Sequence, residues 1–240
     1  MAESRIKTLE VDGISVQVTW KKVRRLTLAV SPPAGDVRVS APPLAGAGYI
    51  RDFIKSKISW IVRQREAMAA RRAAAPTYAD GERHMVWGNS CVLSVCLDQA
   101  HNLVELVGDT LCVSLRCGAD AAHVGRLLAN WRRMQVLAEA AGRVELWRGA
   151  MNLPPVALAV RQMRTRWGSC LPAKGKINLN SQLSKLPYEC LDGVIVHELT
   201  HCIVPNHGAA FYDTMERYFP QWRKIRQMLK DAALNAIGDA

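Results

Sequence analysis

The pentapeptide His-Glu-Leu-Thr-His at 197–201 constrains the fold of this chain more than any other feature. It lies in a segment whose apolar residues recur at helical spacing: Leu191, Val194, Ile195, Val196, Leu199 and Ile203. On a helix, residues four positions apart share a face, so the imidazoles of His197 and His201 can both reach one metal ion. Neutral imidazole is a good ligand for zinc. The pattern therefore predicts a largely buried helix that carries two zinc ligands on one face.

Glu198 follows the first of these histidines, so its carboxylate can lie beside the metal without binding it. A general base must stand there to take a proton from water at the metal. With 6 His and 10 Glu in 240 residues, a shuffled chain contains the pattern His-Glu-x-x-His, where x is any residue, roughly 0.006 times. A purely structural zinc site has no use for a base, so Glu198 favours a hydrolytic site over a metal-stabilised scaffold.

His207 is the candidate for a third ligand. A catalytic zinc usually has three protein ligands and a water molecule. His207 lies six residues beyond His201, after a helix stop formed by Pro205 and Asn206. A break there can fold His207 back towards the metal, and Asn tolerates the left-handed conformation that such a turn often needs. The alternative is that the three histidines are satisfied polar groups of a packed helix.

The rest of the sequence predicts a mixed α+β fold. Apolar alternation predicts strands at 14–20, 26–30 and 37–40, then a long helix from about 48 that Pro76 ends. Beyond it we expect strands within 83–116, at 156–160 and at 177–180, and helices over 121–149, 187–204, 209–218 and 221–236. No internal repeat is evident. Two organisations stay open: a β-rich segment with a basic helix (1–75) before a domain that contains the predicted zinc site (76–240), or one continuous domain.

Composition and charge limit the partners. A hydrophobic content of 49% excludes disorder, and no apolar stretch approaches the roughly 20 residues of a membrane span. Residues 1–75 carry 14 Lys and Arg against 6 Asp and Glu, which favours acidic partners, with nucleic acid the first to test. The densest basic run comprises Lys21, Lys22, Arg24 and Arg25. These residues are candidates for contact with phosphate groups, and the alternative is that they lie on a solvated strand edge and bind nothing.

The cysteines and the N-terminus indicate a cytoplasmic protein. Seven cysteines form no paired framework, so reduced thiols are the simplest interpretation. The first eighteen residues alternate polar and apolar side chains and contain no continuous apolar block, unlike a signal peptide.

Four segments together carry a resemblance to a known family. The sequences RTRWGSC (164–170), INLN (177–180), HELTH (197–201) and NHGAAFY (206–212) resemble the YgjP-like zinc metallopeptidases, relatives of the SprT-like proteins. This resemblance implies a zincin-type α+β fold with a small antiparallel or mixed sheet and a peptide or protein substrate. It also implies one zinc per chain, held by His197, His201 and His207, with Glu198 as the catalytic acid and base. The Phe-Trp pair common in the family is Phe211-Tyr212 here.

The SprT-like relatives suggest a rival hypothesis. In it, the chain is a protease that acts on DNA-bound proteins, or a nucleic-acid-binding module whose zinc is mainly structural. Salt-dependent DNA binding that requires the basic run at 21–25 would support it.

Three further parts of the site are expected from weaker signals. The segment 166–170 either shapes the cleft or forms a tight glycine turn with a structural thiol. In zincins generally an edge strand pairs with an extended substrate. The candidates for such a strand here are Ile177, Asn178, Leu179 and Asn180. The alternative is that these four residues form an internal strand that does not contact the substrate. Arg166 and Tyr212 are candidates for stabilising the oxyanion.

Overall fold

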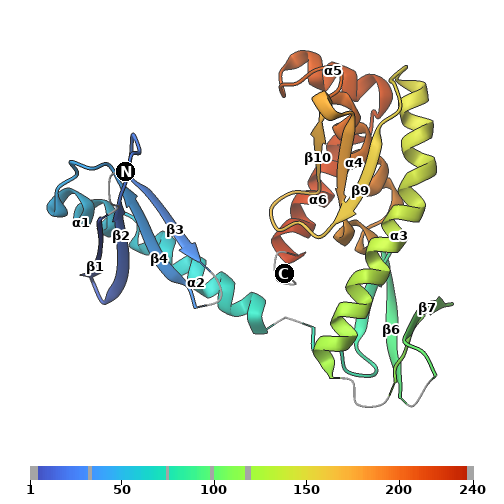
Figure 1. The fold of residues 1–240 in the computed structure, drawn as a ribbon, viewed down its shortest axis with the longest axis horizontal. Coiled ribbons are helices and arrows are strands. Elements are labelled where there is room, and N and C mark those ends of the chain that lie inside the picture. Colours follow the sequence, from blue (N-terminus) through green and yellow to red (C-terminus); the bar gives the residue numbers. More distant parts are fainter. Residues whose placement is uncertain (1–4, 32–33, 74–75, 98–99, 117–119, 237–240) are drawn as a thin grey trace. The chain divides into compact units, whose positions relative to one another are not determined.

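A computed structural model describes residues 5–31, 34–73, 76–97, 100–116 and 120–236. The chain divides into two compact units, Met1–Ala75 and Pro76–Ala240. Figure 1 shows that each unit has a four-stranded sheet with helical segments after it in the chain, and that the second unit adds a further sheet and a group of helices. The mixture of helices and small mixed sheets confirms the predicted α+β class.

The first unit packs one face of a mixed sheet against helices. Its sheet order is β1 (Arg5–Val11), β2 (Ile14–Trp20), β4 (Asp36–Ala41) and β3 (Thr27–Ser31), with β2 and β4 parallel and both outer pairs antiparallel. Alternate strand residues point inwards and pack with the apolar positions of α1 (Ala47–Lys55) and α2 (Ile58–Ala73). The long helix expected after residue 48 is interrupted at Ser56 and Lys57. The core comprises Leu9, Val11, Ile14, Val16, Val18, Val37, Val39, Ala41, Ile50, Ile54 and Ile61.

The second unit begins with a sheet of the same topology. Its order is β5 (Arg83–Val86), β6 (Asn89–Cys96), β8 (Thr110–Ser114) and β7 (Leu103–Val107), again with a parallel central pair and antiparallel outer pairs. The long helix α3 (Ala121–Ala150) follows, and the side chain of Asp120 caps it by accepting a hydrogen bond from the His123 N–H at 2.7 Å. The two sheets are therefore a structural repeat that the sequence does not reveal.

The first hairpin of each sheet turns in the same way. Asp12 and Gly13 have φ values of 48° and 76°, and Trp87 and Gly88 have φ values of 49° and 84°. Positive φ at both central residues is the type I′ geometry, whose twist suits a two-residue hairpin. The sequences of the two turns share only the glycine, because the repeat preserves backbone conformation and apolar alternation rather than residue identity.

The remainder of the second unit forms a small mixed sheet and three α-helices. Strand β11 (Lys176–Asn180) lies between β10 (Gly168–Leu171), to which it is antiparallel, and β9 (Ala157–Arg161), to which it is parallel. Two 3₁₀ turns, η1 (Pro172–Lys174) and η2 (Ser181–Lys185), precede and follow β11. The helices are α4 (Tyr188–Thr200), α5 (Ala209–Tyr218) and α6 (Trp222–Ala236). The helix that was expected to run to about Val204 thus ends at Thr200.

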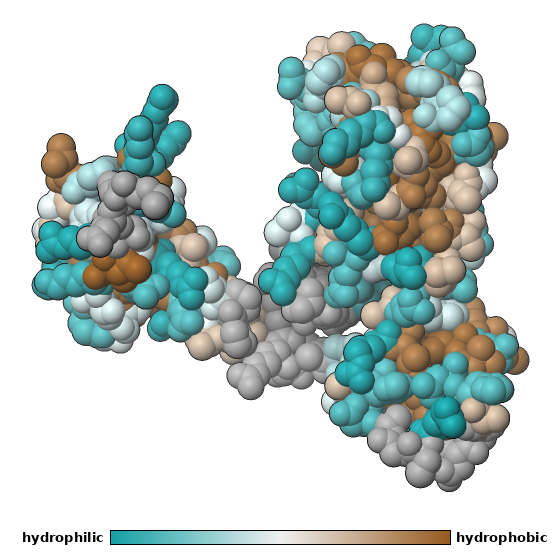
Figure 2. Space-filling view, viewed as in Figure 1, coloured by the Kyte–Doolittle hydropathy of each residue, from teal (hydrophilic) through white to brown (hydrophobic). Residues whose placement is uncertain are grey.

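One continuous apolar core joins these elements of the second unit, from the sheet β5–β8 through α3 to α4 and β11. In the view of Figure 2 the second unit shows more apolar surface than the first, whose visible surface is mostly hydrophilic. Among the described residues, no helix has the length and apolar content that a membrane crossing requires.

Candidate metal centre and catalytic cleft

Helix α4 holds the pentapeptide within the core of the second unit. Its apolar residues Leu191, Ile195 and Leu199 are fully buried, as the helical periodicity predicts. Asp192 on the same helix accepts hydrogen bonds from Arg143 at 2.7 Å and from the indole N–H of Trp147 at 2.9 Å, both on α3. These contacts fix the rotation of α4, and with it the direction of its histidines.

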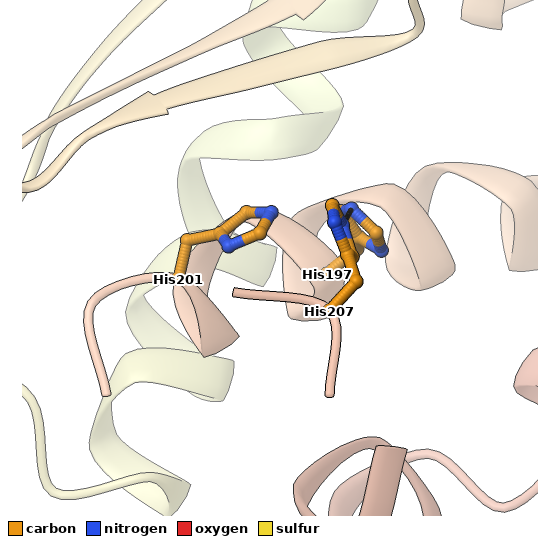
Figure 3. A group of neighbouring side chains, drawn as sticks. All are labelled: His197, His201 and His207. Carbon is orange, nitrogen blue, oxygen red and sulfur yellow. Dashed lines mark hydrogen bonds between the residues drawn. The ribbon is translucent and has the colours of Figure 1, made fainter. Parts of the chain in front are cut away.

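The three predicted histidines converge. His197 lies on α4, and His201 caps the helix with φ −65° and ψ −18°, so the helical i, i+4 relation is kept. One ligand atom from each of His197, His201 and His207 lies within 4.8 Å of the others, and the Nε2 atoms of His197 and His207 are 3.2 Å apart. Figure 3 shows the three imidazoles gathered beside the end of α4, with His207 brought in by the following loop.

The turn after α4 explains how His207 returns. The N–H groups of Ile203 and Val204 still bond to the Thr200 carbonyl, and the chain then reverses through Pro205 and Asn206 to α5. Phe211 on α5 is fully buried, and its ring centroid lies 5.0, 4.8 and 4.6 Å from those of His197, His201 and His207. One aromatic ring therefore supports all three imidazoles.

The donor set fits a zinc ion. Zn–N bonds of about 2.0–2.1 Å in a tetrahedral site place ligand nitrogens about 3.3 Å apart, close to the observed separation of the His197 and His207 nitrogens. Burial, reinforced by the neighbouring imidazoles, lowers the pKa of His197 to about 4 and also lowers the pKa of His201. Neutral imidazoles at ordinary pH are what metal binding requires.

Glu198 is buried beside the histidines, with 5% of its surface exposed. Burial raises the pKa of its carboxyl to about 7, although the charge of Arg166 and a hydrogen bond from the Cys170 backbone N–H oppose the shift. Gly168 on β10 permits this packing, because a Cβ atom there would lie 2.6 Å from Oε1 of Glu198 and 2.9 Å from Val194. The close approach of strand and helix therefore requires glycine at position 168.

A cleft of about 550 Å³ opens beside Glu198, His197 and His207. Helices α4, α5 and α6 and the start of β10 form its walls, and apolar or aromatic side chains supply most of them. A cluster of possible metal ligands and a buried carboxyl thus share one cavity large enough for part of a polypeptide.

The match to a known family model covers most of the chain. The model described as YgjP-like, metallopeptidase domain, matches residues 24–232. The chain belongs to the YgjP-like metallopeptidase family. The resemblance seen in the four sequence segments is thereby confirmed, and the family supports a metal-dependent peptidase that acts on peptides or proteins.

Comparison with solved structures gives partial superpositions. The crystal structure of the metallopeptidase zymogen abylysin of Pyrococcus abyssi is 23% identical, with a TM-score of 0.34, over 37% of this chain and 91% of that one. The zymogen jannalysin of Methanocaldococcus jannaschii is 21% identical, with a TM-score of 0.35, over 38% and 92%. Wss1 of Saccharomyces cerevisiae is 25% identical, with a TM-score of 0.32, over 39% and 78%. A search of the curated proteins found no match.

The structure of this YgjP-like chain corrects the expected substrate strand. Ile177, Asn178, Leu179 and Asn180 are buried in the middle strand of their sheet, with β10 on one side and β9 on the other. Both backbone edges are occupied, so the prediction of an edge strand here is wrong. The polar positions of β11 are internal ties: Asn180 donates to the carbonyls of Met163 and Arg166, both at 2.9 Å.

Of the two interpretations of the segment 166–170, the structure favours the one in which it shapes the cleft, because Arg166, Trp167 and Gly168 line the cavity and a strand replaces the alternative glycine turn. Gly168, Ser169 and Cys170 form strand β10, which is an edge strand of the sheet and packs against α4. The sulfur of Cys170 lies 3.6 Å from that of Cys202, and burial together with this neighbour raises the pKa of Cys170 to about 12. Cys170 is therefore a neutral thiol behind the catalytic cleft.

The other predicted residues fall into two groups. Arg166 and Tyr212 line the cleft, as candidates for the oxyanion should. The segment between β2 and β3 carries four exposed basic residues: Lys21, Lys22, Arg24 and Arg25. These residues belong to the first unit, whereas the three histidines belong to the second. Contact between the four basic residues and nucleic acid stays a prediction.

Helix α6 contributes to the cleft, although none of its residues was among the predicted site residues. Trp222, Ile225, Arg226 and Lys230 line the cleft, although they lie 15 or more residues beyond His207. Their spacing at i, i+3, i+4 and i+8 was a signal of a shared helix face. Only the packing of α6 against α4, where Ile225 lies over Gly193, shows which surface that face covers.

Proposed function

We propose that this chain is a zinc-dependent endopeptidase with one zinc ion, held by His197, His201 and His207, and with Glu198 as general base. The observation that carries the proposal is the convergence of three imidazoles beside a buried carboxyl that lines the same cleft. In this proposal residues 76–240 are the metallopeptidase domain, and the strands and helices of residues 1–75 form an additional unit.

The ligand histidines and the ion have separate tasks. When bound, zinc polarises the scissile carbonyl and increases the acidity of the attacking water. The three imidazoles hold their positions before binding because Phe211 packs against each ring. This preorganisation limits the rearrangement that metal binding requires.

Glu198 moves the proton. Its carboxylate accepts a proton from the attacking water and passes it to the leaving amine of the substrate. A pKa raised to about 7 by burial allows one group to accept and release a proton near neutral pH. The Cys170 N–H, which bonds to the carboxylate, fixes the side chain between β10 and α4.

The edge of β10 opposite β11 pairs with no other strand in the described part of the chain, and its backbone groups other than the Cys170 N–H, which bonds to Glu198, are our candidates for substrate positioning. Trp167 accepts a hydrogen bond from the Asn180 N–H at 2.8 Å, so alternation along the strand directs the backbone groups of Gly168 and Cys170 away from β11 and towards Glu198. An extended peptide added along this edge would lie across the cleft. Arg166 and Tyr212 remain the proposed oxyanion contacts.

Substitution of Glu198 by Gln tests this mechanism. We expect kcat for an unfolded protein substrate to fall about 10²- to 10⁴-fold while zinc content and folding are retained. Mass spectrometry of the fragments measures the rate of cleavage. Glu189→Gln, an exposed change in the first turn of the same helix, is the matched control and should leave kcat unchanged.

Two other outcomes would count against the proposal. An unchanged rate in Glu198→Gln would remove this residue from the mechanism. If the wild-type chain binds zinc and cleaves no substrate, the metal is structural, and the rival hypothesis of a binding module gains support.

A further inference from the structure

The cleft beside the catalytic residues combines an apolar interior with a basic rim. Its interior surfaces come from buried or half-buried side chains of α4, α5, α6 and the start of β10: Trp167, Val194, Phe211, Tyr212, Met215, Trp222 and Ile225. Its exposed cations are Arg166, Arg226 and Lys230, and Glu198 is the only acidic residue among the described residues that line it. An apolar pocket with charge of a single sign at its edge is selective for the shape and charge of its occupant.

The aromatic residues of the cleft form an ordered surface. The rings of Tyr212 and Trp222 stack, with centroids 4.9 Å apart and planes 20° from parallel, and the Trp222 indole N–H donates to Glu216 at 2.8 Å. Trp167, which also lines the cleft, donates its indole N–H to the Leu229 carbonyl at 3.1 Å. Both indoles are therefore held in place by hydrogen bonds within the protein, and the cleft that they line is formed before a ligand enters.

The cations of α6 are available to a ligand. Arg226 and Lys230 are four positions apart and share a helix face, and the Arg226 guanidinium lies 6.0 Å from the centre of the Tyr212 ring. Within the described part of the chain neither residue forms an ion pair, whereas Arg223 on the same helix is paired with Glu216. Arg166 adds a third positive charge from the segment before β10.

We infer that the cleft selects polypeptides with a large apolar side chain next to the scissile bond and an acidic residue adjacent to it. The apolar side chain enters the cleft that Trp167 and Trp222 help to line, and the carboxylate lies at the rim with Arg226 and Lys230. A lysine in the acidic position would meet three like charges at that rim. The inference rests on the proposed peptidase function, because it assigns the substrate of the same site.

Binding without turnover provides the test. Zinc-loaded Glu198→Gln protein is titrated with three peptides that contain Leu-Glu, Leu-Lys or Ala-Glu in an otherwise identical neutral sequence, and tryptophan fluorescence reports binding. We expect the Leu-Glu peptide to bind about tenfold more tightly than either of the others. Its advantage over Leu-Lys should decrease as salt concentration rises, because the rim cations are exposed.

Variants on α6 identify the residues responsible. In the Glu198→Gln background, Arg226→Gln and Lys230→Gln should each reduce the preference for Leu-Glu over Leu-Lys about two- to fivefold. Lys224→Gln, an exposed change on α6 outside the cleft, is the control and should preserve it. Equal binding of the three peptides, an absence of binding, or an unchanged preference in Arg226→Gln would overturn the inference.

The wild-type enzyme separates this inference from the proposed function. Selective binding by Glu198→Gln with no cleavage by the zinc-loaded wild type would refute the peptidase function and retain the ligand preference. Cleavage of all three peptides at equal kcat/KM would retain the function and refute the preference.

Discussion

The two four-stranded sheets have the same strand order and the same first turn, but the second belongs to the unit that carries the candidate metal site and contacts the elements that lead to it. In the first unit a Cβ atom on Gly13 would meet nothing within 4 Å. In the second unit the Trp87 N–H donates to the Ser184 carbonyl at 2.7 Å, and the Gly88 N–H donates to the Lys185 carbonyl at 3.3 Å. The same turn is thus an exposed hairpin end in one unit and a support for η2 in the other.

The contacts around the second turn lead directly to the catalytic helix. The Trp87 ring stacks on Tyr188, the first residue of α4, with centroids 4.4 Å apart. Buried Arg132 on α3 donates to the Met85 carbonyl at 2.9 Å and to the Ser184 hydroxyl at 3.4 Å. The shared strand order of the two sheets therefore does not determine their function. The side chains of Trp87 and Arg132 connect the sheet of the second unit to η2 and α4, whereas the sheet of the first unit, with the same strand order, ends at this turn in an exposed hairpin.

Core substitutions at similar places in the two units should have the largest effect. Leu128→Ala on α3 and Ile54→Ala on α1 each remove a buried side chain, and each should reduce the free energy of unfolding of its own unit by about 2–5 kcal/mol. Leu128→Ala should also reduce hydrolysis, because α3 supports η2 and α4. Chemical denaturation and peptide cleavage measure the two effects. Equal loss of activity in both variants would contradict the division of roles.

Removal of the metal should destabilise the second unit and leave the first unchanged, with a smaller effect than the core substitutions. Zinc at 100 times its Kd stabilises the form that binds it by about 2.7 kcal/mol, and a chelator removes this contribution. We expect faster hydrogen exchange around α4 and α5, with exchange in β1–β4 unchanged, in mass spectrometry of the two states. A uniform increase along the chain would show that the metal does not act locally.

The glycines of the two turns should show the smallest difference. Gly13→Ala places a side chain at positive φ in open space and should cost about 1–2 kcal/mol. Gly88→Ala carries the same strain, and its Cβ would lie 2.9 Å from Pro187 Cγ, so we expect a larger loss of stability in thermal unfolding and a lower rate of hydrolysis. Equal effects on stability and activity would weaken the proposed link between turn and site.

The sequence predicted the parts of the site that depend on local periodicity. Residues four apart on an apolar helix determine the directions of His197 and His201, and the helix stop at Pro205 and Asn206 indicated the return of His207. Glu198 was placed by its position next to a ligand. These inferences needed only the geometry of one helix and one turn.

The errors arise where distant segments meet. The alternation of Ile177, Asn178, Leu179 and Asn180 is typical of a half-exposed strand. In the structure β9 pairs with the second backbone edge of this strand. All four side chains are buried, because the Asn178 and Asn180 amides form hydrogen bonds within the protein. Gly168 suggested a turn, although its role is to let β10 approach Glu198. The contribution of Arg226 depends on how α6 packs, which its own sequence does not indicate.

In the proposed metal site, three histidines of the second unit hold one zinc ion. Elemental mass spectrometry of protein purified without a chelator or a His-tag measures zinc per chain most directly. We predict about one zinc in the wild type and in His101→Ala, which changes an exposed histidine outside the site, and loss of zinc in His201→Ala. Zinc retained in His201→Ala, or absent from the wild type, would contradict the account.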